Sequence, residues 1–140
     1  MTRRVLSDIS SLQIQPTRHR GIGQYTAGVL NALLQHPSPD TCHLFLANGH
    51  LPEPDPFPND SKVDWRLYYG DYPLGGYDPA ECLELVDSYA EYWEAQLERF
   101  SPQVLHIHNP IEWDAPLHSR YSGVPTVLTV YDLIPLKLRR

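Results

Sequence analysis

The sequence predicts an α/β domain in which a mostly parallel, Rossmann-like sheet is flanked by helices. Segments with the alternation or the continuous apolar runs of strands are separated by segments with the 3.6-residue periodicity of amphipathic helices. No internal repeat or low-complexity segment interrupts this order. Strands that alternate with helices form βαβ units with right-handed crossovers. The 140 residues are enough for one domain, so we expect residues 1–140 to form a single unit.

The first third of the chain predicts a strand, a helix and a second strand. The first strand covers residues 3–12, and a long loop leads to a helix that ends before Pro37. Apolar residues of this helix recur three and four positions apart. Its predicted buried face consists of Ile22, Tyr25, Thr26, Val29, Leu30, Leu33 and Leu34. The second strand covers residues 42–48, and its continuous apolar run is typical of a strand that is covered on both faces.

Two irregular loops surround the third predicted strand, which covers residues 63–69. Alternating prolines in residues 51–62 remove backbone donors, so regular structure is not expected there. The loop over residues 70–78 is rich in glycine and leads to a long helix. Asp78 is the predicted N-cap of that helix and Pro79 its first residue. We expect its outer, acidic face to be solvated.

The last two strands are predicted over residues 103–109 and 125–133. His106 and His108 alternate with an apolar residue, so both side chains should point to the same side of their strand. Two histidines on one side would suit a metal ion, but no third ligand follows at a fixed spacing. We therefore expect no metal site. One histidine should pack in the sheet, and the other should line a cleft at the end of the strand.

Composition excludes several functional classes. The formal charge of −6 argues against a nucleic-acid binder, which normally carries a basic face. The N-terminus lacks the apolar core of a signal peptide, and no run approaches the roughly 18 apolar residues of a membrane span. We therefore expect a cytoplasmic protein. The sequence shows no nucleophile elbow and no Ser-His-Asp order, so a hydrolase has little support.

The glycine pair in "RGIGQYT" opens the first helix and raises the question of phosphate binding. In an open α/β sheet, ligands bind beyond the carboxyl ends of the strands, where the strand order reverses. The N-H groups of Gly21, Ile22 and Gly23 would face a phosphate there. The dinucleotide fingerprint is matched poorly, because Thr26 stands where its third glycine or alanine belongs and no acid follows the second strand. Binding of a nicotinamide or flavin cofactor is therefore disfavoured.

Three stretches together resemble a known family. They are "RGIGQYTAGVLNALL", "HIHN" and "VPTVLTVYDLIPL", and with the opening strand they span about Val5 to Leu136. At this spacing they resemble the N-terminal domain of retaining glycosyltransferases of family 4, which have the GT-B architecture. The resemblance implies a sugar transferred from a nucleotide-sugar donor to a glycan or lipid-linked acceptor, as in polysaccharide biosynthesis. It implies no cofactor besides that donor substrate.

The resemblance also assigns roles to particular residues. The turn of Gly21, Ile22 and Gly23 would face the donor diphosphate, and Arg20 would add positive charge. The family often has a histidine before "DLIP", where this sequence has Tyr131 followed by Asp132, and these two are the catalytic candidates. A tyrosine there can donate a hydrogen bond but is a poor proton shuttle near neutral pH. The acceptor-cleft candidates are His108, Asn109 and Trp113.

The family's C-terminal nucleotide-sugar domain has no counterpart in these residues, and even the N-terminal domain is expected to be incomplete. We therefore expect residues 1–140 to be inactive alone and to lie in the cytoplasm, at most peripherally at the inner face of the membrane. The alternative is a non-catalytic half-domain, a binding module that needs a partner. An incomplete sheet would expose an edge, which predicts a homodimer.

Overall fold

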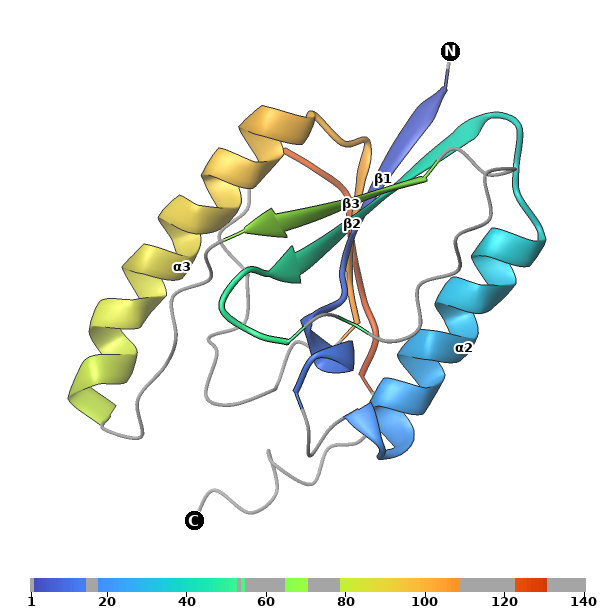
Figure 1. Cartoon of the computed structure of the whole chain (residues 1–140). Helices are drawn as coiled ribbons and strands as arrows, with labels where there is room; N and C mark the ends of the chain where they lie inside the picture. Colours follow the sequence, from blue (N-terminus) through green and yellow to red (C-terminus); the bar gives the residue numbers. More distant parts are fainter. Residues whose placement is uncertain are drawn as a thin grey trace.

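Within the described residues, five parallel strands form one sheet in the order β3-β2-β1-β4-β5 (Figure 1). The strands are β1 (Arg3–Asp8), β2 (Thr41–Asn48), β3 (Trp65–Gly70), β4 (Val104–Ile107) and β5 (Thr126–Leu128). The helices are the short 3-10 helix η1 (Ser10–Leu12) and the α-helices α2 (Gly21–Gln35) and α3 (Pro79–Phe100). This computed structural model describes residues 2–14, 18–52, 54, 65–70, 79–108 and 123–130, with backbone only at 65–67, 69 and 79–89. The predicted α/β class with a parallel, Rossmann-like sheet is confirmed.

The strand order reverses beside β1. The chain runs from β1 outward to β2 and β3, and then returns to the other side of β1 to form β4 and β5. Asp8, the last residue of β1, is in register with Leu46 of β2 and with Ile107 of β4. The carboxyl ends of β1 and β4 therefore meet at the position where open α/β sheets bind their ligands.

The two α-helices cover opposite faces of the sheet (Figure 1). On the side of α2, one buried cluster comprises Ile9, Leu12, Leu30, Leu34, Phe45 and Ala47. On the side of α3, the other comprises Leu6, Cys42, Leu44, Leu46, Trp93, Phe100, Leu105 and Ile107. Residues of β2 contribute to both clusters, which confirms the prediction of a strand covered on both faces.

Helix α2 begins at the glycine pair and ends before Pro37, as predicted. Its fully buried side chains, Thr26, Leu30 and Leu34, are spaced four residues apart and form a narrow stripe. The prediction that Tyr25 belongs to the buried face is wrong, because its side chain is 50% exposed. One residue rotates a helix by about 100°, which moves Tyr25 off a stripe centred on Thr26.

Strand β1 is shorter than the predicted segment of residues 3–12. The backbone N-H of Ser10 donates to Oδ1 of Asp8 over 3.0 Å, and the N-H of Leu12 donates to the carbonyl of Ile9 over 2.9 Å. An aspartate that bonds the backbone two residues later favours a turn over a continued strand. The chain therefore leaves the sheet at Asp8 and coils into η1.

The remaining elements follow the prediction, although β4 and β5 are shorter than their predicted segments. Helix α3 begins at Pro79 and stops before Ser101, which has a left-handed φ of 43°. Its outer acids Glu91, Glu94 and Glu98 are exposed as predicted. The predicted N-cap Asp78 lies outside the described residues, as do residues 131–133 of the last predicted strand. No helix in the described part of the chain combines the length and the apolar character that a membrane crossing requires.

Candidate functional site

The first turn of α2 lies at the carboxyl edge of the sheet, packed against η1 (Figure 1). Arg20 precedes the helix with an extended backbone, and among the described residues no side-chain hydrogen bond caps this end. The first turn also contains no acidic residue. The first N-H groups of a helix have no intrahelical partner and carry the positive end of the helix dipole. The amides of Gly21, Ile22 and Gly23 are therefore placed to attract an anion.

Neither packing nor backbone conformation requires a glycine at position 21. A Cβ atom built on Gly21 would meet no atom within 4 Å, and its φ lies outside the left-handed range. The next glycine, Gly23, is buried within the first turn. The backbone at Gly21 therefore faces open space, and a phosphate group could approach it without meeting a side chain.

Buried polar residues connect η1 and the residue after it to α2 and to the end of β2. Ser11 of η1 donates a hydrogen bond to Oγ1 of Thr26 in α2 over 3.2 Å, and both side chains are buried. Gln13 pairs with the end of β2: its Nε2 donates to the carbonyl of Asn48 over 2.9 Å, and its Oε1 accepts from the N-H of Asn48 over 2.7 Å. These bonds fix the start of α2 relative to the strand ends.

Ser11 and Gln13 were not predicted to contribute to the site. Each is a single polar residue in a segment interpreted as strand or loop. The partner of Ser11 lies 15 residues away and the partner of Gln13 lies 35 residues away. Only the capacity of a buried glutamine to bond both the N-H and the carbonyl of one residue would have pointed to such a role.

The two histidines of β4 lie on one side of the strand, as predicted. Their ring centroids are 3.8 Å apart with the planes tilted by 35°. Nε2 of His106 shares a hydrogen bond of 2.9 Å with Oγ1 of Thr129, which follows β5. Within the described residues, neither ring nitrogen of His108 has a hydrogen-bond partner, and the side chain is only 1% exposed. His108 thus combines deep burial with unused donor and acceptor capacity.

Burial sets the charge of both rings. It lowers the pKa of His108 to about 3, and the neighbouring His106 lowers it further in the same direction. Burial also lowers the pKa of His106. A charged imidazole loses its hydration when it is buried, so both rings are neutral at neutral pH. In the described part of the chain, no group of three or more histidine, cysteine, aspartate or glutamate residues is arranged to hold a metal ion.

The structure brings His108 and the first turn of α2 to the same edge of the sheet. His108 directly follows β4 at the reversal of strand order, and Gly21 follows the loop from β1. Arg20 is exposed beside the first turn. The other predicted site residues, Asn109, Trp113, Tyr131 and Asp132, lie outside the described residues. Their roles, and the role of His108 in an acceptor cleft, stay predictions.

Fold and site together define a class of protein: a parallel α/β domain with an uncapped, glycine-containing helix start where the strand order reverses. Comparisons of the chain with protein-family models, with curated proteins and with solved structures find no match. An assignment of function therefore depends on the residues of this chain.

Proposed function

We propose that the chain is the N-terminal, acceptor-side domain of a retaining glycosyltransferase of the GT-B type. The observation that carries this proposal is the first turn of α2, which opens at the reversal of strand order without a side-chain cap. The sequence resemblance assigns the donor diphosphate to this same turn. A parallel sheet with helices on both faces is compatible with that architecture.

In this proposal, the first turn stabilises the leaving group of the transfer. The bond between the sugar and the diphosphate breaks through an oxocarbenium-like state, so negative charge accumulates on the diphosphate oxygens. The fixed N-H groups of Gly21, Ile22 and Gly23 would donate hydrogen bonds to these oxygens without having to reorganise. The exposed Arg20 would add a charge-assisted hydrogen bond. Tyr131 and Asp132 would act on the reacting sugar. The substrates would be a nucleotide-sugar and a glycan or lipid-linked acceptor.

In this architecture a second domain holds the nucleotide and most of the sugar. Binding of a diphosphate, rather than turnover, is therefore the property that residues 1–140 should show alone. The cytoplasmic location, at most peripheral to the inner face of the membrane, belongs to the same proposal.

Replacing Gly21 with alanine should weaken diphosphate binding without loss of stability. A Cβ atom at this position meets nothing in the folded chain, so the unfolding free energy should be unchanged or higher by up to about 1 kcal/mol. The methyl group would separate the diphosphate from the first-turn amides. Loss of one charge-assisted hydrogen bond should weaken binding about tenfold. Calorimetric titration with inorganic pyrophosphate measures this change.

Gly28 provides the matched control, because it lies in the same helix and a Cβ atom there also meets nothing within 4 Å. Gly28→Ala should bind pyrophosphate as the unchanged chain does. Equal affinity of the Gly21→Ala and Gly28→Ala variants would contradict a phosphate site at the first turn.

A second candidate function, a non-catalytic binding module that needs a partner, is favoured by the edge of the sheet. Strand β5 is one of the two edge strands of the described sheet, opposite β3, and Val127, Leu128 and Val130 at this edge are 50%, 44% and 48% exposed. Apolar side chains beside unpaired strand backbone favour pairing with another chain. Under this candidate the partner surface is β5, and a second copy of the chain is the simplest partner.

Self-association through β5 is the testable consequence of this second candidate. Light scattering should show a dimer that Leu128→Lys dissociates, because a lysine on an edge strand opposes strand pairing. Tyr25→Lys is the control, since Tyr25 is also half-exposed and apolar but lies on α2. A monomer at high concentration, or equal effects of both substitutions, would exclude pairing through β5.

A further inference from the structure

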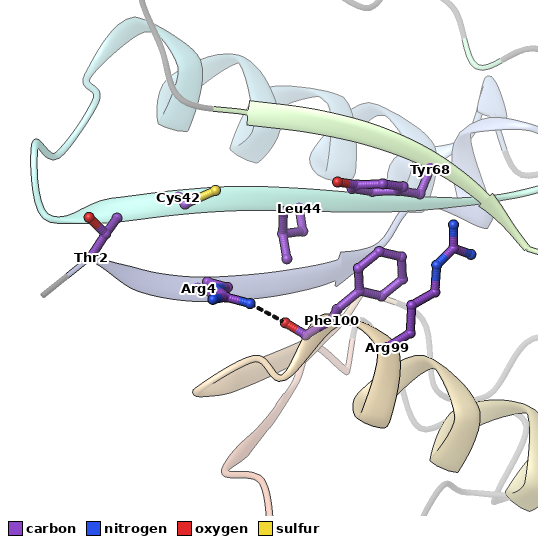
Figure 2. Close-up of a pocket in the computed structure, with 7 residues that line it drawn as sticks. All are labelled: Thr2, Arg4, Cys42, Leu44, Tyr68, Arg99 and Phe100. Carbon is purple, nitrogen blue, oxygen red and sulfur yellow. Dashed lines mark hydrogen bonds between the residues drawn. The ribbon is translucent and has the colours of Figure 1, made fainter.

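A pocket of about 480 Å³ lies between the sheet and the end of α3, near the amino ends of β1 and β2 (Figure 2). Cys42 and Leu44 of β2, Tyr68 of β3 and Phe100 of α3 line it. Thr2 and two arginines, Arg4 and Arg99, complete the lining. The candidate phosphate turn at the start of α2 belongs to the opposite, carboxyl edge of the sheet, so this pocket is a separate feature of the molecule.

One part of the pocket is aromatic and apolar. The ring centroids of Tyr68 and Phe100 are 4.5 Å apart, with the planes tilted by 53°. Leu44 and Phe100 belong to the buried cluster on this face, and Tyr68 packs against that cluster. Such a wall offers a flat ring both apolar contact and the tilted or edge-on geometry that aromatic pairs prefer.

The other part of the pocket is positively charged. The guanidinium carbon of Arg99 lies 4.8 Å from the ring centroid of Phe100 and 5.6 Å from that of Tyr68. Nη1 of Arg4 donates to the carbonyl of Phe100 over 3.0 Å, as Figure 2 shows. Both arginines are exposed, and neither pairs with a carboxylate among the described residues. The two guanidinium groups lie on either side of the Phe100 ring and make the lining positively charged on a chain of net charge −6 (Figure 2).

The contacts of the two arginines leave donors for a ligand. A guanidinium that lies over a ring uses its face, so the N-H groups at its edge still point outward. Arg4 uses one of its five N-H donors for the carbonyl of Phe100. The planar arrangement of the remaining donors matches the oxygens of a phosphate or carboxylate.

We propose that this pocket binds a small aromatic anion, a flat ring that carries a phosphate or a carboxylate group. The ring packs against Tyr68 and Phe100, and Arg99, whose guanidinium lies over those two rings, holds the anionic group, while Arg4 adds positive charge to the lining. The volume of about 480 Å³ is within the range of small-molecule sites. The proposal does not depend on the glycosyltransferase function, because no residue of the pocket belongs to the donor or acceptor site.

Phenyl phosphate is the probe, with phenol and inorganic phosphate as its two halves. In a titration of the isotopically labelled chain, phenyl phosphate should shift the amide signals of Leu44, Tyr68 and Phe100. Each half alone should bind at least about tenfold more weakly, because it makes only the ring contacts or only the arginine contacts. Equal binding of inorganic phosphate and phenyl phosphate would overturn the proposal, as would shifts confined to the first turn of α2.

Arg99→Gln tests the charged part, and Arg3→Gln is its control. Arg3 is an exposed neighbour in β1 whose side chain alternates to the other face of the strand. Arg99→Gln should weaken phenyl phosphate binding about tenfold or more, and Arg3→Gln should leave it unchanged. Equal weakening by both substitutions would mean general attraction by positive charge and would overturn the site. The comparison of the three probes on the unchanged chain needs no variant, so it tests the proposal whether or not Arg99→Gln folds.

Discussion

The unfolding free energy of the chain should fall steadily as the pH is lowered from about 6.5 towards 3, because the folded state holds His108 uncharged. An unfolded histidine takes up a proton near pH 6.5, whereas burial lowers the pKa of His108 in the folded chain to about 3. Between these values the unfolded state binds more protons, so stability rises with pH and is lost as the pH falls. The burial that lowers the pKa of His106 acts in the same direction.

The size of this effect makes it visible in a small domain. Each unit of difference in pKa between the folded and unfolded states corresponds to about 1.4 kcal/mol, so the contribution of His108 reaches roughly 4 to 5 kcal/mol near pH 3. Small domains have a total stability of about 5 to 15 kcal/mol. Protonation of His108 alone would therefore remove a large share of the unfolding free energy.

Urea unfolding at a series of pH values measures this dependence. His108→Phe keeps a flat ring against His106 but cannot be protonated, so its unfolding free energy should fall less between pH 6.5 and 3. His36→Phe is the control, because His36 is exposed at the end of α2. If the curves of His108→Phe and the unchanged chain run parallel, His108 is not held neutral by the fold.

Trp93→Ala should cost about 3 to 5 kcal/mol of unfolding free energy, because Trp93 is fully buried in the cluster between α3 and the sheet. Its ring also makes an edge-on contact with Tyr92, with centroids 5.5 Å apart and the planes at 82°. Removing the indole leaves a cavity that the surrounding strands fill only in part. The variant should be mostly unfolded at temperatures where the unchanged chain is folded.

Glu94→Ala is the control for the tryptophan variant. Glu94 follows Trp93 in α3 but is exposed, so its loss should change stability by no more than about 0.5 kcal/mol. Circular dichroism during urea unfolding measures both variants. A loss below about 1 kcal/mol for Trp93→Ala would mean that α3 does not pack on the sheet as described.

Most of the fold prediction was based on the periodicity of apolar residues and on continuous apolar runs. The spacing of apolar residues predicted α2, Pro79 marked the start of α3, and the run of residues 44–47 predicted a strand covered on both faces. The end of β1 was not predictable in this way. It depends on one bond between the Asp8 side chain and the Ser10 backbone, which competes with the strand.

The candidate site was predictable only where its signal is local. The glycine turn of α2 and the alternation of His106 and His108 are visible in short stretches. The burial of His108 and the pairing of Gln13 depend on elements distant in sequence. The aromatic-anion pocket is an extreme case, because Arg4 and Phe100 are 96 residues apart and meet only when β1 lies beside the end of α3.

A titration of the isotopically labelled chain with inorganic pyrophosphate, followed by amide signals, tests the proposed function most directly. We expect the signals of Gly21, Ile22 and Gly23 to shift most and to saturate together in the millimolar range. Unchanged signals at these three residues, with shifts elsewhere or none at all, would contradict a donor-diphosphate site at the start of α2.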